Sequence, residues 1–240
     1  MMIVWMVVAA FGVAGLIRVV FAEEVQACFD RDPAARNLAE VLLTYSGLHA
    51  VIAYRMAHAL QRLRVPVVPR VMMLLVRGLT GIEIHPSAQI GRGLFIDHGM
   101  GVVIGETAII GRNVTLYQGV TLGGTGKERG KRHPTIGDNV VIGAGAKVLG
   151  NITIGNDSMV GANAVVIRDV PPHSTVVGVP GRITKIKDQH FPGVKLDHSH
   201  LPDPLTERLQ ALQREIDALE HHLKEHRKAD SPPHPTSPKG

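Results

Sequence analysis

The chain has few aromatic residues and only one cysteine. Aromatic residues make up 4% of its 240 residues, although hydrophobic residues as a whole make up 45%. An ordinary globular core uses more large rings, so we expect a core of small and β-branched side chains in a repeating arrangement. The single Cys28 excludes a disulfide within the chain and is typical of a reducing compartment.

A strong excess of charge of one sign is also lacking, because the formal net charge is only +5 at pH 7. Aromatic residues that would stack on bases do not lie among the densest basic residues. The pattern therefore favours a small anionic ligand, such as a nucleotide phosphate, over nucleic acid. These basic residues are Lys127, Arg129, Lys131 and Arg132.

Long apolar segments are limited to the N-terminus, where residues 1–17 are almost wholly apolar. A signal peptide requires a positive residue ahead of such a run, and none precedes Ile3. The run is also short and glycine-interrupted for a membrane-spanning helix. We expect residues 1–18 to be a buried or interfacial helix, or an extension from a start codon assigned too early, with a signal or membrane anchor as the alternative. The expected location is the cytoplasm.

A six-residue period runs through the middle of the chain and predicts a parallel β-helix over residues 82–186. Three hexapeptides form one triangular coil, in which the ladder side chains stack inside. We expect one strict register, interrupted once by a glycine- and lysine-rich insertion at 121–135. The ladder residues are Ile84, Ile90, Ile96, Val102, Ala108, Val114, Val120, Ile136, Ile142, Val148, Ile154, Val160 and Val166.

The flanking segments predict helices, so the fold class is mainly β with α. Residues 19–81 show helical spacing of apolar residues and form a small helical domain ahead of the β-helix. Residues 187–203 read as a linker, and 204–228 carry a heptad seam typical of a coiled-coil helix. We expect the tail at 229–240, rich in proline and serine, to be disordered.

Two constellations could carry chemistry. Asp97 and His98 follow a ladder residue at a coil corner, where an imidazole could deprotonate an alcohol. Glu83 lies fifteen residues earlier, about one coil below, and could orient that imidazole. The alternative is a surface histidine beside a solvated acid.

The second constellation is the insertion, with Arg132 and His133 at its base. Arg132 suits bidentate binding of a carboxylate, whereas the alternative is a solvated basic loop. The glycine-rich segment 123–127 lacks the spacing and strand-to-helix context of a phosphate loop. A β-helix zinc site would need two histidines five residues apart, and none lies five residues from His98 or His133, so no metal is expected.

Together these segments resemble the serine O-acetyltransferase family, over residues 20–225. That resemblance implies a left-handed β-helix and transfer of acetyl from acetyl-CoA to the hydroxyl of L-serine, which opens cysteine synthesis. The segments that carry it are 31–34 (RDPA), 45–50 (YSGLHA), 81–86 (GIEIHP), 95–99 (FIDHG), 103–107 (VIGET), 118–127 (QGVTLGGTGK), 131–134 (KRHP) and 179–182 (VPGR).

The resemblance also implies a role for each matching position. His98 matches the general base, and Glu83 stands where the family often has an aspartate that orients it. Direct transfer then needs no covalent acyl-enzyme. The residues that match binding positions are Asp32, Asp97, Arg132 and His133 for the amino acid, and Gly124 and Ala144 for backbone contacts to the coenzyme between adjacent β-helices of a trimer.

Regulation and assembly are further implications of the resemblance. The helical domain is short, which implies a single homotrimer. Relatives that insert their C-terminus into O-acetylserine sulfhydrylase end in isoleucine, whereas this chain ends in Gly240, so that complex is not expected. Feedback inhibition by L-cysteine at the serine site is expected. The alternatives left open are a hexapeptide acetyltransferase for a sugar or other hydroxyl acceptor, and a non-catalytic trimeric scaffold.

Overall fold

The computed structural model describes residues 20–126, 129–185 and 204–229. It divides the chain into two units, residues 1–201 and 202–240. The expectations for residues 1–18, 187–203 and 230–240 therefore lie outside the described residues.

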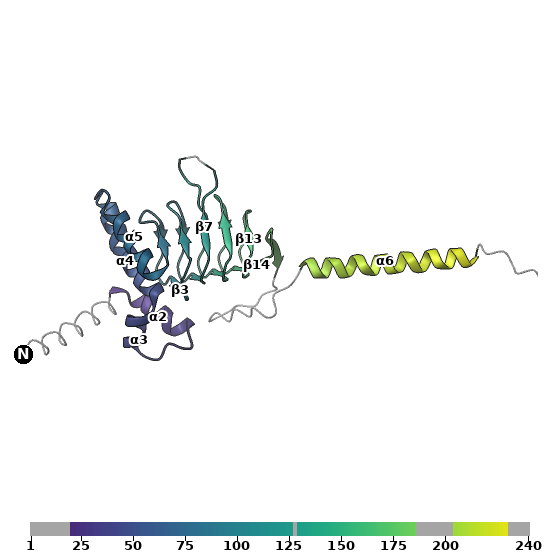
Figure 1. Ribbon diagram of the computed structural model, residues 1–240, viewed down its shortest axis with the longest axis horizontal. Helices are drawn as coiled ribbons and strands as arrows, with labels where there is room; N and C mark the ends of the chain where they lie inside the picture. The colour runs from purple at the N-terminus through teal and green to yellow at the C-terminus, as the bar shows by residue number, and fades with distance from the viewer. Residues whose placement is uncertain (1–19, 127–128, 186–203, 230–240) are drawn as a thin grey trace, which may run out of the picture. The chain divides into compact units, whose positions relative to one another are not determined.

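Most of the first unit is a parallel β-helix with three faces, whose strands stack as successive rungs (Figure 1). Face 1 has the order β1-β4-β7-β10-β13, face 2 the order β11-β8-β5-β2, and face 3 the order β15-β14-β12-β9-β6-β3. The strands are β1 (Glu83–Ile84), β2 (Gln89–Ile90), β3 (Phe95–Ile96), β4 (Val103–Ile104), β5 (Ile109–Ile110), β6 (Thr115–Leu116), β7 (Thr121–Gly123), β8 (Thr135–Ile136), β9 (Val141–Ile142), β10 (Lys147–Leu149), β11 (Thr153–Ile154), β12 (Met159–Val160), β13 (Val165–Val166), β14 (Ser174–Val177) and β15 (Arg182–Lys185).

The chain turns at three corners on each coil. We call them corner 1/2, corner 2/3 and corner 3/1, after the faces that they join. All pairings are parallel except that of β14 with β15, which is antiparallel and lies at the end of the face 3 order.

The predicted ladder residues are all buried, but the expected single register is wrong. In the strand pairing, Ile84 lies beside Ile104, not beside Val102. The reason is corner 3/1 after β3, which spans residues 97–102, two more than the equivalent corner at 117–120.

This shift is invisible in the hydrophobic pattern because each rung buries two inward positions. One is the second residue of the strand, and the other lies two residues before it, as with Ile82 and Ile84, which are 0% and 1% exposed. Before the two-residue addition, the six-residue ladder falls on the second residue of each strand. Directly after it, the ladder falls on the inward position two residues earlier, so the hydrophobic pattern continues unbroken. The β-helix is interrupted twice, and both interruptions carry residues selected for chemistry.

The larger interruption follows β7 at corner 1/2. The strands β7 and β8 include Thr121 and Thr135, so the loop itself spans residues 124–134. It projects from the regular stack (Figure 1).

Helices α2 (Ala22–Arg31), α3 (Leu38–Thr44), α4 (Ser46–Arg62) and α5 (Val68–Thr80) precede the strands. Asn37 caps α3 by accepting a hydrogen bond from the N–H of Glu40. The first turn of α4 packs tightly on β3, because a Cβ at Gly47 would lie 2.1 Å from the carbonyl oxygen of Ile96. The Tyr54 hydroxyl of α4 donates to the carbonyl of Ala88 at 2.5 Å. The helical domain is thus fixed to the first coil.

Helix α5 presents an unusually apolar surface to solvent. It contacts α4 and β1, and Met73 and Thr80 on that side are buried. The opposite side carries large hydrophobic residues that are 48–87% exposed, and we call it the α5 apolar face. Its residues are Val68, Val71, Leu74, Leu75 and Leu79.

The second unit contains α6 (Pro204–Ala229), which agrees with the predicted C-terminal helix. Its predicted seam residues Leu209, Leu212, Ile216 and Leu219 are 47–63% exposed. In the part of the chain that the structure describes, no helix combines the length and apolarity needed to cross a bilayer.

Candidate functional site

The residues selected from the sequence lie at two different corners of the β-helix. Asp97 and His98 occupy corner 3/1 after β3, and Asp32, at the end of α2, lies near enough to perturb Asp97. Arg132 and His133 lie at corner 1/2, at the base of the insertion. We call these the aspartate–histidine group and the arginine–histidine group.

The imidazole of His98 is presented to solvent. Its backbone has a φ of 56°, which is uncommon for a residue other than glycine. Ser46, at the start of α4, donates a hydrogen bond to its carbonyl at 3.2 Å. The side chain is 74% exposed, and Nε2 lies 3.9 Å from Oδ1 of Asp97, beyond hydrogen-bonding distance. The ring is therefore accessible to a bound molecule.

Two carboxylates converge beside His98. Asp32 accepts hydrogen bonds from the N–H of Ala34 at 2.7 Å and from the hydroxyl of Tyr45 at 2.5 Å. Burial raises the pKa of Asp97, and the negative charge of Asp32 adds to that rise against the opposing effect of His98. A cation such as an ammonium group would relieve the repulsion between the two carboxylates.

Arg31 anchors this segment to the β-helix. Its Nη1 donates to the carbonyls of Gly93 at 3.2 Å and Val114 at 3.1 Å, and to the hydroxyl of Thr115 at 3.0 Å. Burial lowers the pKa of the Arg31 guanidinium. Because Arg31 immediately precedes Asp32, these bonds hold the end of α2 against the β-helix beside Asp32.

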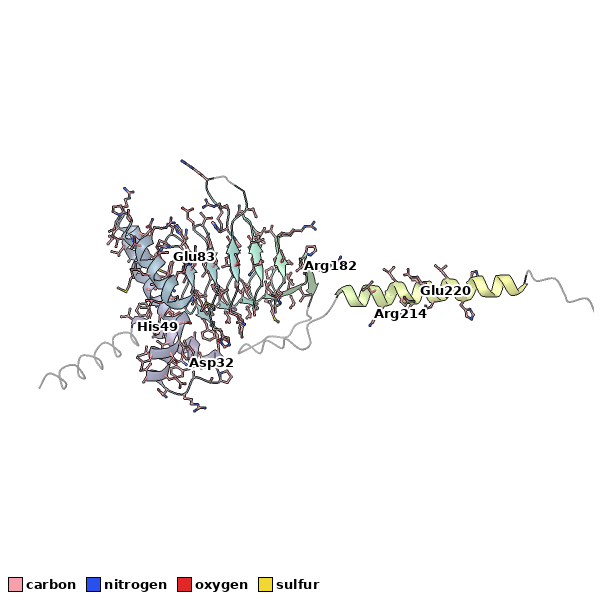
Figure 2. The ribbon with its side chains drawn as sticks, in the orientation of Figure 1. Asp32, His49, Glu83, Arg182, Arg214 and Glu220 are labelled. Atoms are coloured by element: carbon pink, nitrogen blue, oxygen red, sulfur yellow. The ribbon has the colours of Figure 1, made fainter. Side chains whose placement is uncertain are left out.

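Glu83 lies next to the same corner, as its spacing predicts, but its carboxylate pairs with α5. The N–H of Glu83 donates to the carbonyl of Val102, the last residue of the His98 corner, at 2.9 Å. Its carboxylate forms an ion pair with Arg77 at 2.9 Å, and the side chain is 48% exposed. Figure 2 labels Glu83 near the start of the strands and Asp32 on the α2–α3 segment.

In the arginine–histidine group, Arg132 is oriented by an acid. Its Nη2 contacts Oε2 of Glu106 at 2.6 Å, and the Arg132 side chain is 32% exposed. The remaining donors of the planar guanidinium are suited to a carboxylate ligand.

His133 is buried, at 8% exposed, and is held by Thr107. Its Nδ1 lies 3.2 Å from the N–H of Thr107 and 2.9 Å from its hydroxyl oxygen. Burial lowers the pKa of His133, and the positive charge of Arg132 lowers it further. The pKa of His85 is also lowered, chiefly by burial and next by the positive charge of Arg70.

The two positions matched to coenzyme contacts also lie at different corners. Gly124 is exposed at corner 1/2, where an added Cβ would lie 3.1 Å from Nε2 of His133. Ala144 lies at corner 3/1, two coils beyond His98, and its carbonyl accepts a hydrogen bond from Asn163.

Within one chain the two groups remain apart. In residues 20–126 and 129–185, no hydrogen bond or ion pair joins Asp32, Asp97 or His98 to Arg132 or His133. Face 1 separates the two corners and is bounded by both.

Sequence reasoning assigned no role to Arg31, Tyr45, Glu106 or Thr107. Each lies inside a segment that carries the family resemblance, but no residue pattern reveals that Tyr45 reaches Asp32 or that Thr107 reaches His133 across 26 residues. Among the described residues no cluster of three histidine, cysteine or acidic side chains is arranged to hold a metal.

Comparison with known proteins gives a consistent result. Residues 133–168 match the family described as bacterial transferase hexapeptide (six repeats). The chain is 55% identical over 201 residues to the serine acetyltransferase of Bacillus pumilus (strain SAFR-032), covering 84% of this chain and 92% of that protein. The structure of soybean serine acetyltransferase complexed with serine aligns with a TM-score of 0.68 at 45% identity, covering 73% of this chain and 72% of that chain. A serine acetyltransferase in complex with cysteine aligns with a TM-score of 0.69 at 42% identity, covering 74% of this chain and 73% of that chain.

Proposed function

This chain belongs to the serine acetyltransferase family, and we propose that its two groups of site residues transfer acetyl from acetyl-CoA to the hydroxyl of L-serine. It is an acyltransferase of the first step in cysteine synthesis from serine, built on the left-handed hexapeptide β-helix. The products of the proposed reaction are O-acetyl-L-serine and CoA.

The converging carboxylates carry the proposal for serine. Asp32 and Asp97 bind the ammonium of the amino acid, whose positive charge compensates the repulsion between the two carboxylates; that repulsion adds to the effect of burial in raising the pKa of Asp97. Arg132 binds the carboxylate of serine with the guanidinium donors that Glu106 leaves available. A zwitterion held at both ends presents its hydroxyl between the two groups.

His98 is the general base in this proposal. Its exposed Nε2 takes the proton of the serine hydroxyl as that oxygen attacks the thioester carbonyl, and the proton then leaves with the CoA thiolate. A covalent acyl-enzyme on cysteine is disfavoured, because Cys28 is buried and burial raises the pKa of its thiol to about 12. The rate gain comes from positioning the two substrates and from the base.

For Glu83 to orient His98, its carboxylate must exchange Arg77 for the imidazole. A half-exposed ion pair of this kind contributes little stability, so the exchange costs little. We expect Glu83→Gln to lower turnover about tenfold, whereas an unchanged turnover would assign Glu83 to the α5 ion pair alone.

We propose that the working unit is a homotrimer whose sites lie between chains. The separation of the two groups on either side of face 1 supports this, because three chains arranged with face 1 inward bring unlike corners together. The α5 apolar face adds support. Arg77 connects α5 to Glu83 on face 1, so the exposed leucines of α5 continue the surface that a second copy would cover. Gly124 of one chain and Ala144 of its neighbour would then line one coenzyme cleft.

The test is CoA release from acetyl-CoA with L-serine, compared with a galactoside as acceptor. The proposal expects CoA release with L-serine and none above background with the galactoside. Release with the galactoside would support the sugar-acceptor alternative, and no release with either would support the non-catalytic scaffold. Repeating the assay with L-cysteine tests the proposed feedback inhibitor, which should compete with serine because it presents the same ammonium and carboxylate.

A further inference from the structure

The hydrogen bonds of Thr107 define the protonation state of His133. The hydroxyl oxygen of Thr107 accepts from the backbone N–H of Arg132 at 3.0 Å and from that of His133 at 3.1 Å. A hydroxyl has two acceptor lone pairs and one donor hydrogen, so both lone pairs are used. Its hydrogen then points at the remaining close neighbour, Nδ1 of His133, at 2.9 Å.

The backbone of Thr107 supports the same assignment. Its N–H also points at Nδ1 of His133, at 3.2 Å. Two donors directed at one ring nitrogen require that nitrogen to be an acceptor, so Nδ1 carries no proton. The neutral ring then carries its proton on Nε2.

The surroundings of the ring keep it neutral and fix its direction. It is buried beside Arg132, and Lys131 donates from Nζ to the carbonyls of Thr107 at 2.9 Å and His133 at 2.5 Å. The Cδ2–Nε2 edge packs on Gly105, where an added Cβ would lie 2.0 Å from Cδ2. The edge that bears Nε2 thus lies between Gly105 and the exposed Gly124.

We propose that Thr107 is a positioning residue that holds His133 as a neutral Nε2–H donor toward the carboxylate end of the amino acid. This deepens the proposed function and rests on it for the identity of the ligand. Arg132 supplies the positive charge. His133 supplies a hydrogen bond from Nε2–H, and the contacts of Thr107 with Nδ1 fix the orientation of the ring. Thr107 also satisfies the backbone N–H groups of both residues, so one hydroxyl sets the geometry of the whole arginine–histidine group.

The first experiment reads the tautomer without reference to activity. The full chain with ¹⁵N-labelled histidine is examined by long-range ¹H–¹⁵N NMR near neutral pH, and the His133 signals are assigned by their loss in His133→Gln. The proposal expects an unprotonated Nδ1 and a protonated Nε2. A protonated Nδ1, or a fully charged ring, would overturn it.

The second experiment measures kinetics for three variants. Thr107→Val keeps the shape but removes the hydroxyl, Thr107→Ser keeps the hydroxyl, and Thr153→Val makes the same change at an exposed threonine on face 2. We expect Thr107→Val to raise the KM for L-serine about tenfold or more, since two backbone donors and one ring nitrogen lose their partner. The KM for acetyl-CoA should change little, Thr107→Ser should restore the serine KM, and Thr153→Val should match the unchanged chain.

A purely structural role is separated by the pH profile. Without the hydroxyl donor the His133 ring gains protons more readily, so on lowering the pH the serine KM of Thr107→Val should begin to change at a higher pH than that of the unchanged chain. A serine KM within twofold of the unchanged chain, or one that Thr107→Ser fails to restore, would overturn the role of Thr107. Absence of serine acetylation in the unchanged chain would instead overturn the proposed function, while the NMR experiment would still test the tautomer.

Discussion

Gly105 offers a sharp test of the arginine–histidine group, because the three atoms nearest to an added Cβ there all belong to His133. Its Cβ would lie 2.0 Å from Cδ2 and 2.1 Å from Nε2 of His133, and ordinary contact begins at 3.4 Å, so the ring must move by about 1.4 Å. A misplacement of about 1 Å typically costs about 10²-fold in rate. We therefore expect Gly105→Ala to lower kcat/KM for L-serine about 100-fold, measured by CoA release.

The control is Gly137→Ala, which crowds corner 2/3, where neither group lies. There the new Cβ would lie 2.8 Å from the backbone nitrogen of Asn156 and 2.3 Å from its side-chain oxygen, so the backbone itself must shift. We expect this variant to lose about 1–3 kcal/mol of stability in thermal unfolding while its serine KM is unchanged. A folded Gly105→Ala variant with normal kcat/KM would refute the placement of His133 in the serine site.

Three further outcomes follow from the same geometry. His98→Ala should lower turnover about 10²–10⁴-fold with the assembly intact by light scattering, the usual contribution of a positioned base; near-normal turnover would remove it from the mechanism. Because the folded-state pKa of His133 is lowered, the unfolded chain binds more protons as pH falls below ~6.5, so the unfolding free energy should decrease there. In urea titrations that decrease should be smaller in His133→Gln, and an equal slope would contradict the assignment. Leu75→Glu on the α5 apolar face should dissociate the assembly, whereas Leu43→Glu on α3, at a residue 77% exposed, should not; intact Leu75→Glu trimers would exclude this face as the contact.

The fold could be predicted because its signal is periodic. Each coil buries aliphatic residues at equivalent positions, so aliphatic residues recur along the sequence at the spacing of the strands. The same periodicity hides the two-residue expansion around His98. The two inward positions of a rung, such as 82 and 84, are both aliphatic, so a shift from one inward position to the other leaves the hydrophobic pattern unchanged.

The candidate site was predictable residue by residue but not as an arrangement. The spacing of Glu83 and His98 predicts that they lie on adjacent coils. The spacing does not predict the rotamer of Glu83, and in this structure its carboxylate pairs with Arg77. The contacts of Tyr45 with Asp32 and of Thr107 with His133 depend on how separate segments fold together. A sequence pattern does not reveal which segments come into contact in the folded chain.

Mixed assemblies of two inactive variants show directly whether each site is shared between two chains. His98→Ala and Arg132→Ala chains, each inactive alone, are co-expressed with different tags, and doubly tagged assemblies are isolated. If the two groups meet across a chain boundary, each doubly tagged trimer has both intact groups at one of its three sites, and serine acetylation should recover to about one third of the unchanged level. Mixed assemblies no more active than the two parent variants would contradict the shared site.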